Sequence, residues 1–133
     1  MPSNRTLVAI IAHPDDESYS ASGTLAHYAS IGVEVYIICA TRGESGKISH
    51  PSLAYRDVLG AVREEELRDA CRIMGIHQPL FLGYRDSGMM GTSDNNDPLS
   101  LNKAKPSEVL RRLVGLLRQL KPEVIISYLL IKS

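Results

Sequence analysis

The run His13-Pro14-Asp15-Asp16-Glu17 places an imidazole and three carboxylates within five residues. An apolar, β-branched segment, residues 6–12, precedes it, and the proline in the second position favours a turn there. On such a turn His13 and Asp16 can direct a nitrogen and an oxygen at one ion, while Asp15 points elsewhere. Nitrogen and oxygen donors suit zinc, so this run predicts a zinc site with a spare acid beside it.

The spare acid indicates hydrolysis. A catalytic zinc normally has three protein ligands and an open position for water, and it lowers the pKa of that water from about 15.7 towards about 7. An unligated carboxylate nearby can take the proton as the water attacks a carbonyl, which makes Asp15 the candidate general base. The alternative is that the three acids only cap the next helix, while His13 packs at the end of a strand.

Strand and helix patterns alternate around this run. We expect strands at residues 6–12, 33–40, 79–82 and 124–131, and helices at residues 23–31, 57–74 and 106–120. Gly32 and Gly75 are expected to end the first two helices. The alternation predicts an α/β fold that is Rossmann-like, with three layers and a doubly wound, mainly parallel sheet. Residues 85–98 are rich in Gly, Ser, Asp and Asn and predict a long functional loop.

Three polar groups follow the first three expected strands. In doubly wound sheets, ligands bind beyond the carboxyl ends of the strands. The residues at these ends are 13–17, 41–45 and 84–88, and each group carries at least one carboxylate. We therefore expect one shared site at this edge of the sheet.

Four motifs, in order along the chain, resemble the PIG-L/LmbE-type deacetylases. They are Ala12-His-Pro-Asp-Asp-Glu17, Thr41-Arg-Gly-Glu-Ser-Gly46, Arg63-x-x-Glu66 and Arg85-Asp-Ser-Gly-Met89. That family includes the N-acetylglucosaminyl-inositol deacetylases of mycothiol and bacillithiol synthesis and the mycothiol S-conjugate amidase. The resemblance extends to about Tyr128. It implies zinc-dependent hydrolysis of an N-acetyl amide on a glucosamine-containing small molecule, such as N-acetylglucosaminyl-inositol.

The resemblance also implies roles for single residues. His13 and Asp16 would be zinc ligands and Asp15 the general base, while the positions that face the substrate would be Glu44, Arg63 and Asp86. Each substrate position has a plainer alternative. Arg63 lies in a highly charged helix and could belong to a solvated, salt-bridged face. Glu44 and Asp86 lie in Gly/Ser turns, where an acid often binds its own backbone. The other histidines are expected to be surface or packing residues: His27, His50 and His77.

One family feature is missing. The resemblance implies a third zinc ligand, a histidine in a Gly-His-Pro-Asp-His-like loop after the strand that begins at Val124, but here the sequence reads Leu129-Leu-Ile-Lys-Ser133. Two ligands hold zinc weakly, because each missing donor removes binding energy. We therefore expect either a truncated or altered gene product, or a chain without hydrolytic activity that still binds the sugar.

A rival from another class is a phosphorylated receiver domain, which is also a doubly wound sheet with an acidic pair after its first strand. Asp86 would then be the phosphoacceptor and Lys132 the lysine of such a domain, with magnesium as the ion. Against this, a receiver has no use for His13, and Asp86 follows its strand by several residues. The likeness is one of fold alone.

Composition sets the remaining limits. A chain of 133 residues with 44% hydrophobic content is expected to form a single domain, residues 1–133. Fifteen basic residues balance fifteen acidic ones, which gives no reason to expect nucleic acid, and no apolar run approaches the roughly 20 residues of a membrane span. Cys39 and Cys71 lie singly in apolar runs, which favours the cytoplasm. The apolar strand at residues 124–131 would expose an edge, so a homo-oligomer is expected.

Overall fold

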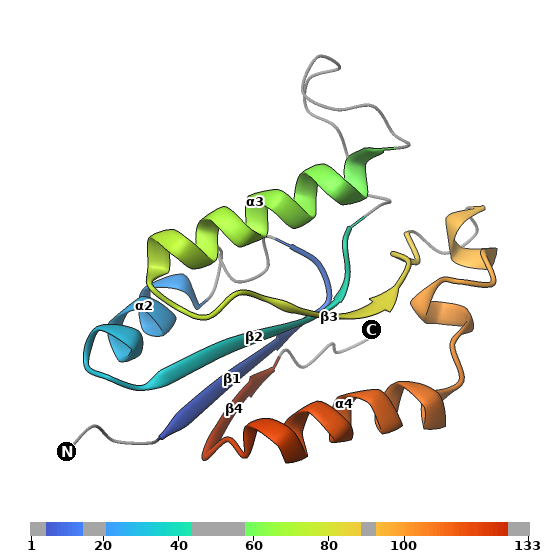
Figure 1. Ribbon diagram of the computed structural model, residues 1–133. Coiled ribbons are helices and arrows are strands. Elements are labelled where there is room, and N and C mark those ends of the chain that lie inside the picture. Colours follow the sequence, from blue (N-terminus) through green and yellow to red (C-terminus); the bar gives the residue numbers. More distant parts are fainter. Residues whose placement is uncertain (1–4, 15–20, 44–57, 89–92, 128–133) are drawn as a thin grey trace, which may run out of the picture.

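The structure is a computed structural model that describes residues 5–14, 21–43, 58–88 and 93–127. Its described part forms one parallel sheet in the order β3-β2-β1-β4 (Figure 1). The strands are β1 (Thr6–Ile11), β2 (Glu34–Thr41), β3 (Leu80–Tyr84) and β4 (Val124–Ser127). The helices are α2 (Ser22–Ser30), α3 (Leu59–Met74) and α4 (Pro106–Leu120), with 3-10 turns at Asp94–Asn96 and Leu101–Lys103. The expected α/β class with a parallel sheet is confirmed.

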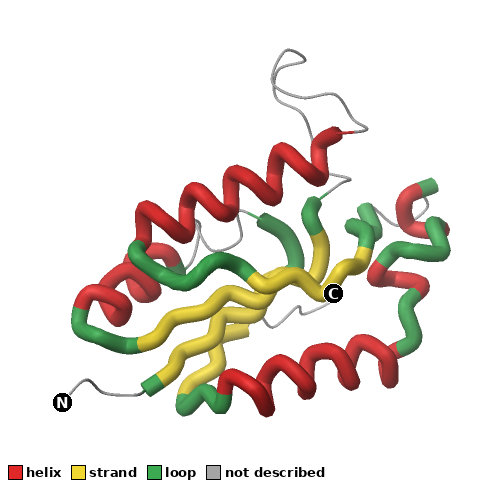
Figure 2. Tube along the Cα trace, viewed as in Figure 1, coloured by secondary structure: helices red, strands yellow, loops and turns green. Residues whose placement is uncertain are grey.

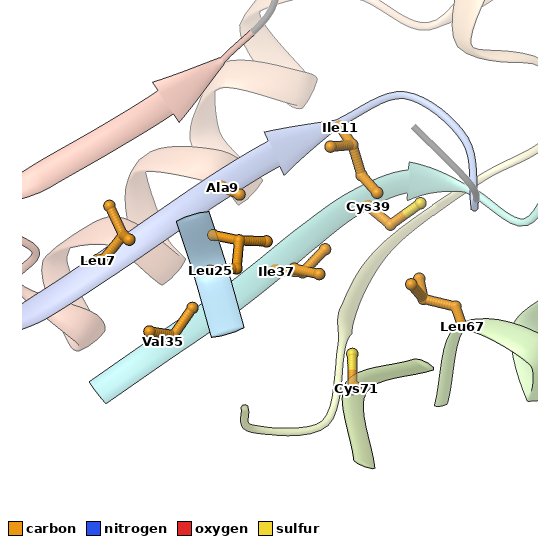
Figure 3. Close-up of a cluster of buried hydrophobic side chains, with 9 residues drawn as sticks. All are labelled: Leu7, Ala9, Ile11, Leu25, Val35, Ile37, Cys39, Leu67 and Cys71. Carbon is orange, nitrogen blue, oxygen red and sulfur yellow. The ribbon is translucent and has the colours of Figure 1, made fainter. Parts of the chain in front are cut away.

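The elements form three layers. Helices α2 and α3 cover one face of the sheet, and α4 covers the other (Figures 1 and 2). The core beneath α2 and α3 takes alternate residues of β1 and β2, which Figure 3 shows together with their helix partners: Leu7, Ala9, Ile11, Leu25, Val35, Ile37, Cys39, Leu67 and Cys71. The other alternate residues, such as Val8 and Ile38, pack on the α4 side. Parallel strands covered on both faces must be apolar throughout, and this explains the continuous apolar runs in the sequence.

The two glycine stops lie where the sequence predicts them. Gly75 has φ +75°, and its N–H donates to the carbonyl of Arg72 at 3.2 Å, which ends α3. Gly32, just after α2, has φ +96°. A residue without Cβ enters this left-handed region without steric conflict, so both helices can turn back towards the sheet.

Helix α4 packs on the sheet through one face. Its contact stripe to the sheet is Val109, Leu113, Leu116, Leu117 and Leu120. Leu110, which hydrophobicity alone would place in that stripe, is 60% exposed. One residue turns an α-helix by about 100°, so Val109 and Leu110 cannot both face the sheet squarely. None of the described helices is long and apolar enough to cross a membrane.

The carboxyl ends of β1, β2 and β3 meet at one edge of the sheet. Ile11 is in register with Cys39, and Thr41 with Tyr84, with a register shift in the β2–β3 pairing between Cys39 and Thr41. We call the described residues at and just beyond these ends, 12–14, 41–43 and 84–88, the carboxyl edge. The sequence-based expectation that these groups share one edge is confirmed for the residues that the structure describes.

Candidate active site

Thr41 joins the ends of β1 and β2. Its N–H and its hydroxyl both donate to the carbonyl oxygen of Ala12, at 3.1 and 2.9 Å, and its hydroxyl oxygen accepts from the N–H of Gly43 at 3.1 Å. Thr41 is 1% exposed. The hydroxyl therefore fixes the points from which both following turns leave the sheet. In the sequence Thr41 is only one residue of a motif and this role is not apparent, although a threonine at a strand end commonly bonds to local backbone groups.

Arg63 links α3 to both turns. Its Nη2 donates to the carbonyl oxygen of Pro14 at 2.6 Å and its Nη1 to that of Gly43 at 2.8 Å. The approach is so close that a Cβ on Gly43 would lie 2.2 Å from Nη1. A planar guanidinium suits this geometry, because its N–H groups leave in fixed directions. Neither alternative for Arg63, a substrate contact or a solvated salt-bridged face, anticipated this anchoring of the backbone.

His13 and Asp86 meet at the carboxyl edge. The His13 Nε2 lies 3.1 Å from the Asp86 Oδ1, which also accepts the N–H of Gly88 at 3.1 Å. The Asp86 side chain is 7% exposed and that of His13 is 41% exposed. An ionised carboxylate only accepts hydrogen bonds, so Nε2 is the donor in this pair. The structure thus brings together two of the residues singled out from sequence, from strands that are separated in the sheet by β2.

Three site residues lie outside the described part of the chain: Asp15, Asp16 and Glu44. Their roles as general base, metal ligand and substrate contact stay predictions. The described backbone still bears on them, because Pro14 immediately precedes Asp15 and Gly43 immediately precedes Glu44. Arg63 holds the carbonyl of each of these two residues. Both undescribed segments therefore start from anchored positions.

One residue at the edge, His13, has surroundings that are compatible with a zinc ligand. A histidine that binds a metal usually gives its other ring N–H to a carboxylate or a carbonyl, which is the arrangement of His13 with Asp86. The exposed part of the imidazole leaves room for an ion to approach. In the described ranges, no group of three or more His, Cys, Asp and Glu side chains could hold a metal. The expected second ligand, Asp16, is outside those ranges.

Two hollows lie at the opposite end of the described sheet. One, of about 840 Å³, is lined by the starts of β1 and β4 together with α2, and a smaller one, of about 390 Å³, includes His77. His77 stacks on Tyr36 with ring centroids 4.2 Å apart and also contacts Glu34. It is an exposed surface histidine, as expected, although it has a carboxylate partner in space. Neither hollow includes His13, Arg63 or Asp86, and we place the chemistry at the carboxyl edge because its polar groups converge there.

Comparison with known proteins gives a family model and relatives that are all named as deacetylases. Residues 8–132 match the family model described as PIG-L: GlcNAc-PI de-N-acetylase. The 1D-myo-inositol 2-acetamido-2-deoxy-alpha-D-glucopyranoside deacetylase of Acidothermus cellulolyticus is 42% identical over 133 residues, which cover 93% of this chain and 46% of that protein. The chain spans about half the length of the curated relatives it matches.

Solved structures share the fold. The N,N'-diacetylchitobiose deacetylase of Pyrococcus horikoshii matches with a TM-score of 0.72 and 27% identity, over 92% of this chain and 40% of that one. The 4-carboxy-2-hydroxymuconate hydratase of Pseudomonas putida matches with a TM-score of 0.67 and 23% identity, over 91% of this chain and 45% of that one. A hydratase on the same fold shows that the fold alone does not determine the reaction, so the site must do so.

Proposed function

Because the chain belongs to the PIG-L family of GlcNAc-PI de-N-acetylases, we propose that it carries a zinc-dependent site that hydrolyses the N-acetyl amide of a glucosamine-containing small molecule. N-acetylglucosaminyl-inositol is the proposed substrate, since the matching relatives are named for the deacetylation of such a compound. The observation that carries the proposal is the His13–Asp86 pair at the carboxyl edge.

The proposed reaction is amide hydrolysis. The oxygen of a water molecule bonds to the acetyl carbonyl carbon, the C–N bond breaks, acetate leaves, and the sugar nitrogen takes a proton to become a free amine. Asp15 is the proposed general base: it takes a proton from the attacking water and can return it to the leaving nitrogen. When bound, zinc supplies a Lewis acid for the carbonyl and makes water easier to deprotonate.

The residues of the chain have distinct proposed tasks. His13 and Asp16 hold the zinc, and Arg63 fixes Pro14, which immediately precedes Asp15 in the sequence, through its bond to the Pro14 carbonyl. Glu44, Arg63 and Asp86 remain proposed substrate contacts. For Asp86, only the small exposed part of the side chain could touch the sugar.

We also propose that the chain works in the cytoplasm. Both cysteines, Cys39 and Cys71, are free thiols buried in the core, and such thiols persist in a reducing compartment.

The test uses the purified chain, its zinc affinity and the release of amine from N-acetylglucosaminyl-inositol. Because only two ligands are proposed, the unchanged chain is expected to bind zinc weakly. We expect His13→Ala to lose that zinc and any release of amine, and Asp15→Ala to keep the zinc while its rate falls by about 100-fold or more. His27→Ala is the matched control, because His27 is an exposed histidine on α2, remote from the carboxyl edge. Full deacetylation by Asp15→Ala would remove the proposed base. Zinc and sugar binding without amine release would indicate a binding protein.

A further inference from the structure

We propose that Asp86 is a positioning residue for His13: it holds the imidazole so that Nδ1, and not Nε2, is the ring nitrogen that faces the metal. The inference rests on the proposed zinc site and deepens it. Asp86 would then act on the metal through His13, in addition to any contact with the sugar.

The pair is built from two distant segments. His13 follows β1, and Asp86, 73 residues later, follows β3. Strand β2 lies between these two strands in the sheet. Their 3.1 Å contact therefore depends on both turns leaving the sheet at fixed points. Thr41 and Arg63 secure the β1 turn through the carbonyls of Ala12 and Pro14.

The carboxylate is itself held in place. Its Oδ1 accepts the N–H of Gly88, two residues on, where φ is +63°. This is the local backbone bond that an acid in a Gly/Ser turn is expected to make. The same oxygen reaches His13 as well, so the turn aims the carboxylate at the imidazole.

The burial of the Asp86 carboxylate makes its hydrogen bond with His13 favourable. A carboxylate that is 7% exposed loses most of its hydration, and this is unfavourable unless hydrogen bonds replace the lost water. Here Gly88 and His13 provide two of them. The Asp86 carboxylate accepts a hydrogen bond from Nε2 and so keeps the ring proton on that nitrogen. A carboxylate bonded to Nε2 also makes Nδ1 a better metal ligand. The loss of such a partner typically weakens metal affinity by about 10- to 100-fold.

Asp97 offers a matched control. It too accepts a backbone N–H two residues on, from Leu99 at 2.9 Å, and it contacts a basic side chain, Arg85, at 3.3 Å. Its partner is an arginine, however, and not the proposed zinc ligand. Asp97→Ala therefore removes the same kind of turn bond from the same loop without affecting the His13 contact.

Two readouts test the inference on the full 133-residue chain. The first is zinc affinity, measured by competition with a chromophoric chelator. The second is the tautomer of His13 in the zinc-free protein, read from its ¹⁵N NMR shifts about two pH units above the ordinary histidine pKa of about 6.5. The variants are Asp86→Ala, Asp86→Asn, Asp97→Ala and His13→Ala, each checked for folding by its unfolding midpoint.

We expect Asp86→Ala to bind zinc about 10- to 100-fold more weakly and to lose the fixed Nε2–H tautomer. Asp86→Asn should recover part of the zinc affinity and of the fixed tautomer, because its amide oxygen can still accept both N–H groups. If Asp86→Ala fails to fold, the Asp86→Asn variant tests the positioning role. Asp97→Ala should match the unchanged chain in both readouts.

The contrary outcomes separate this inference from the proposed function. Unchanged zinc affinity and tautomer in both Asp86 variants, with zinc lost in His13→Ala, would overturn the positioning role and leave the metal site standing. A loss in Asp86→Asn as large as that in His13→Ala would make Asp86 a direct ligand and also overturn it. Zinc affinity unaffected by His13→Ala would refute the metal site itself, and the tautomer would then decide the His13–Asp86 pairing alone.

Discussion

The two ends of the sheet are organised by different physics. At the carboxyl edge, polar groups are buried and joined to one another: Thr41 is 1% exposed and Asp86 is 5% exposed. At the amino end, apolar side chains stay in contact with solvent around the hollow of about 840 Å³. Tyr28, Ile31 and Val124, which line it, are 42%, 60% and 54% exposed.

The difference indicates what each end is for. Burying a carboxylate and a guanidinium is unfavourable unless each is paired, and the same volume filled by apolar residues would stabilise the fold at least as well. The pairs at the carboxyl edge therefore serve mainly to fix positions, although removing one partner is still destabilising because it leaves the other unpaired. The amino end and strand β4 instead leave apolar surface uncovered, which is the property of a surface that contacts other protein.

The largest expected effect comes from Gly43→Ala at the carboxyl edge. The new Cβ would lie 2.2 Å from the Arg63 Nη1, and the backbone has φ +71°. We expect the free energy of unfolding to fall by about 3 kcal/mol, from backbone strain and the displaced arginine. Denaturant unfolding measures it.

Gly115→Ala is the control for that substitution. Gly115 lies inside α4, and a Cβ there would meet nothing within 4 Å. We expect it to stabilise the chain by about 0.5 to 1 kcal/mol, because alanine loses less entropy in a helix than glycine. Similar losses in both variants would contradict the close-packed arrangement at Gly43.

The next effect is expected at Arg63. Arg63→Met keeps a long apolar side chain but leaves the carbonyls of Pro14 and Gly43 without this donor, so we expect a loss of about 2 kcal/mol in unfolding free energy and weaker zinc binding. Arg68→Met on the same helix removes a pair with Glu64 one turn away and a guanidinium contact over the Phe81 ring, but no bond to the turns, and should change stability by less than about 1 kcal/mol. An Arg63 variant as stable as the Arg68 variant would show that the anchoring is unimportant.

Much of this contrast can be predicted from sequence, because it follows from chain order. The apolar runs, Gly75 and the strand–helix alternation fix the parallel sheet, and the parallel sheet brings residues 13, 41–43 and 86 to one edge. The bonds from Arg63 to two carbonyls depend on the docking of α3 against the turns. A charged helix pattern is equally compatible with a solvated face, so the sequence could not reveal those bonds.

The pairing of His13 with Asp86 shows the same limit. The motifs identify each residue, and the edge rule places both at the same end of the sheet. Which atoms meet depends on the turn at Gly88 and on the irregularity between Cys39 and Thr41, which are side-chain and backbone details without a sequence period.

At β4, we expect self-association of the chain in sedimentation. The strand pairs with β1 and leaves its other side as an edge in the described sheet, with Ile125 48% exposed. A lysine on an edge strand opposes pairing with another chain, so Ile125→Lys should weaken association about tenfold. Ile73→Lys, at an apolar side chain on α3 that is 87% exposed, should leave it unchanged. A monomer at every concentration would refute the prediction.

The smallest effect is expected near the start of α4, on the face of the sheet opposite α2 and α3. The pKa of Glu108 is lowered mainly by a hydrogen bond from Arg111 and by the positive charge of Arg111, and further by Arg112. The ionised form is thus favoured in the fold, so its contribution to stability is present above the ordinary glutamate pKa and is lost as pH falls through the lowered value. NMR titration should show the lowered pKa, and Arg111→Gln should move it back up. An unchanged pKa in that variant would exclude Arg111 as the main cause.

The most direct test of the zinc site is a crystal structure of the chain grown with zinc and recorded at the zinc absorption edge. We expect an anomalous peak at the carboxyl edge about 2.0 to 2.1 Å from the His13 Nδ1, with Nε2 still on Asp86. A peak elsewhere, or none, with His13 turned away from Asp86, would contradict the proposed site.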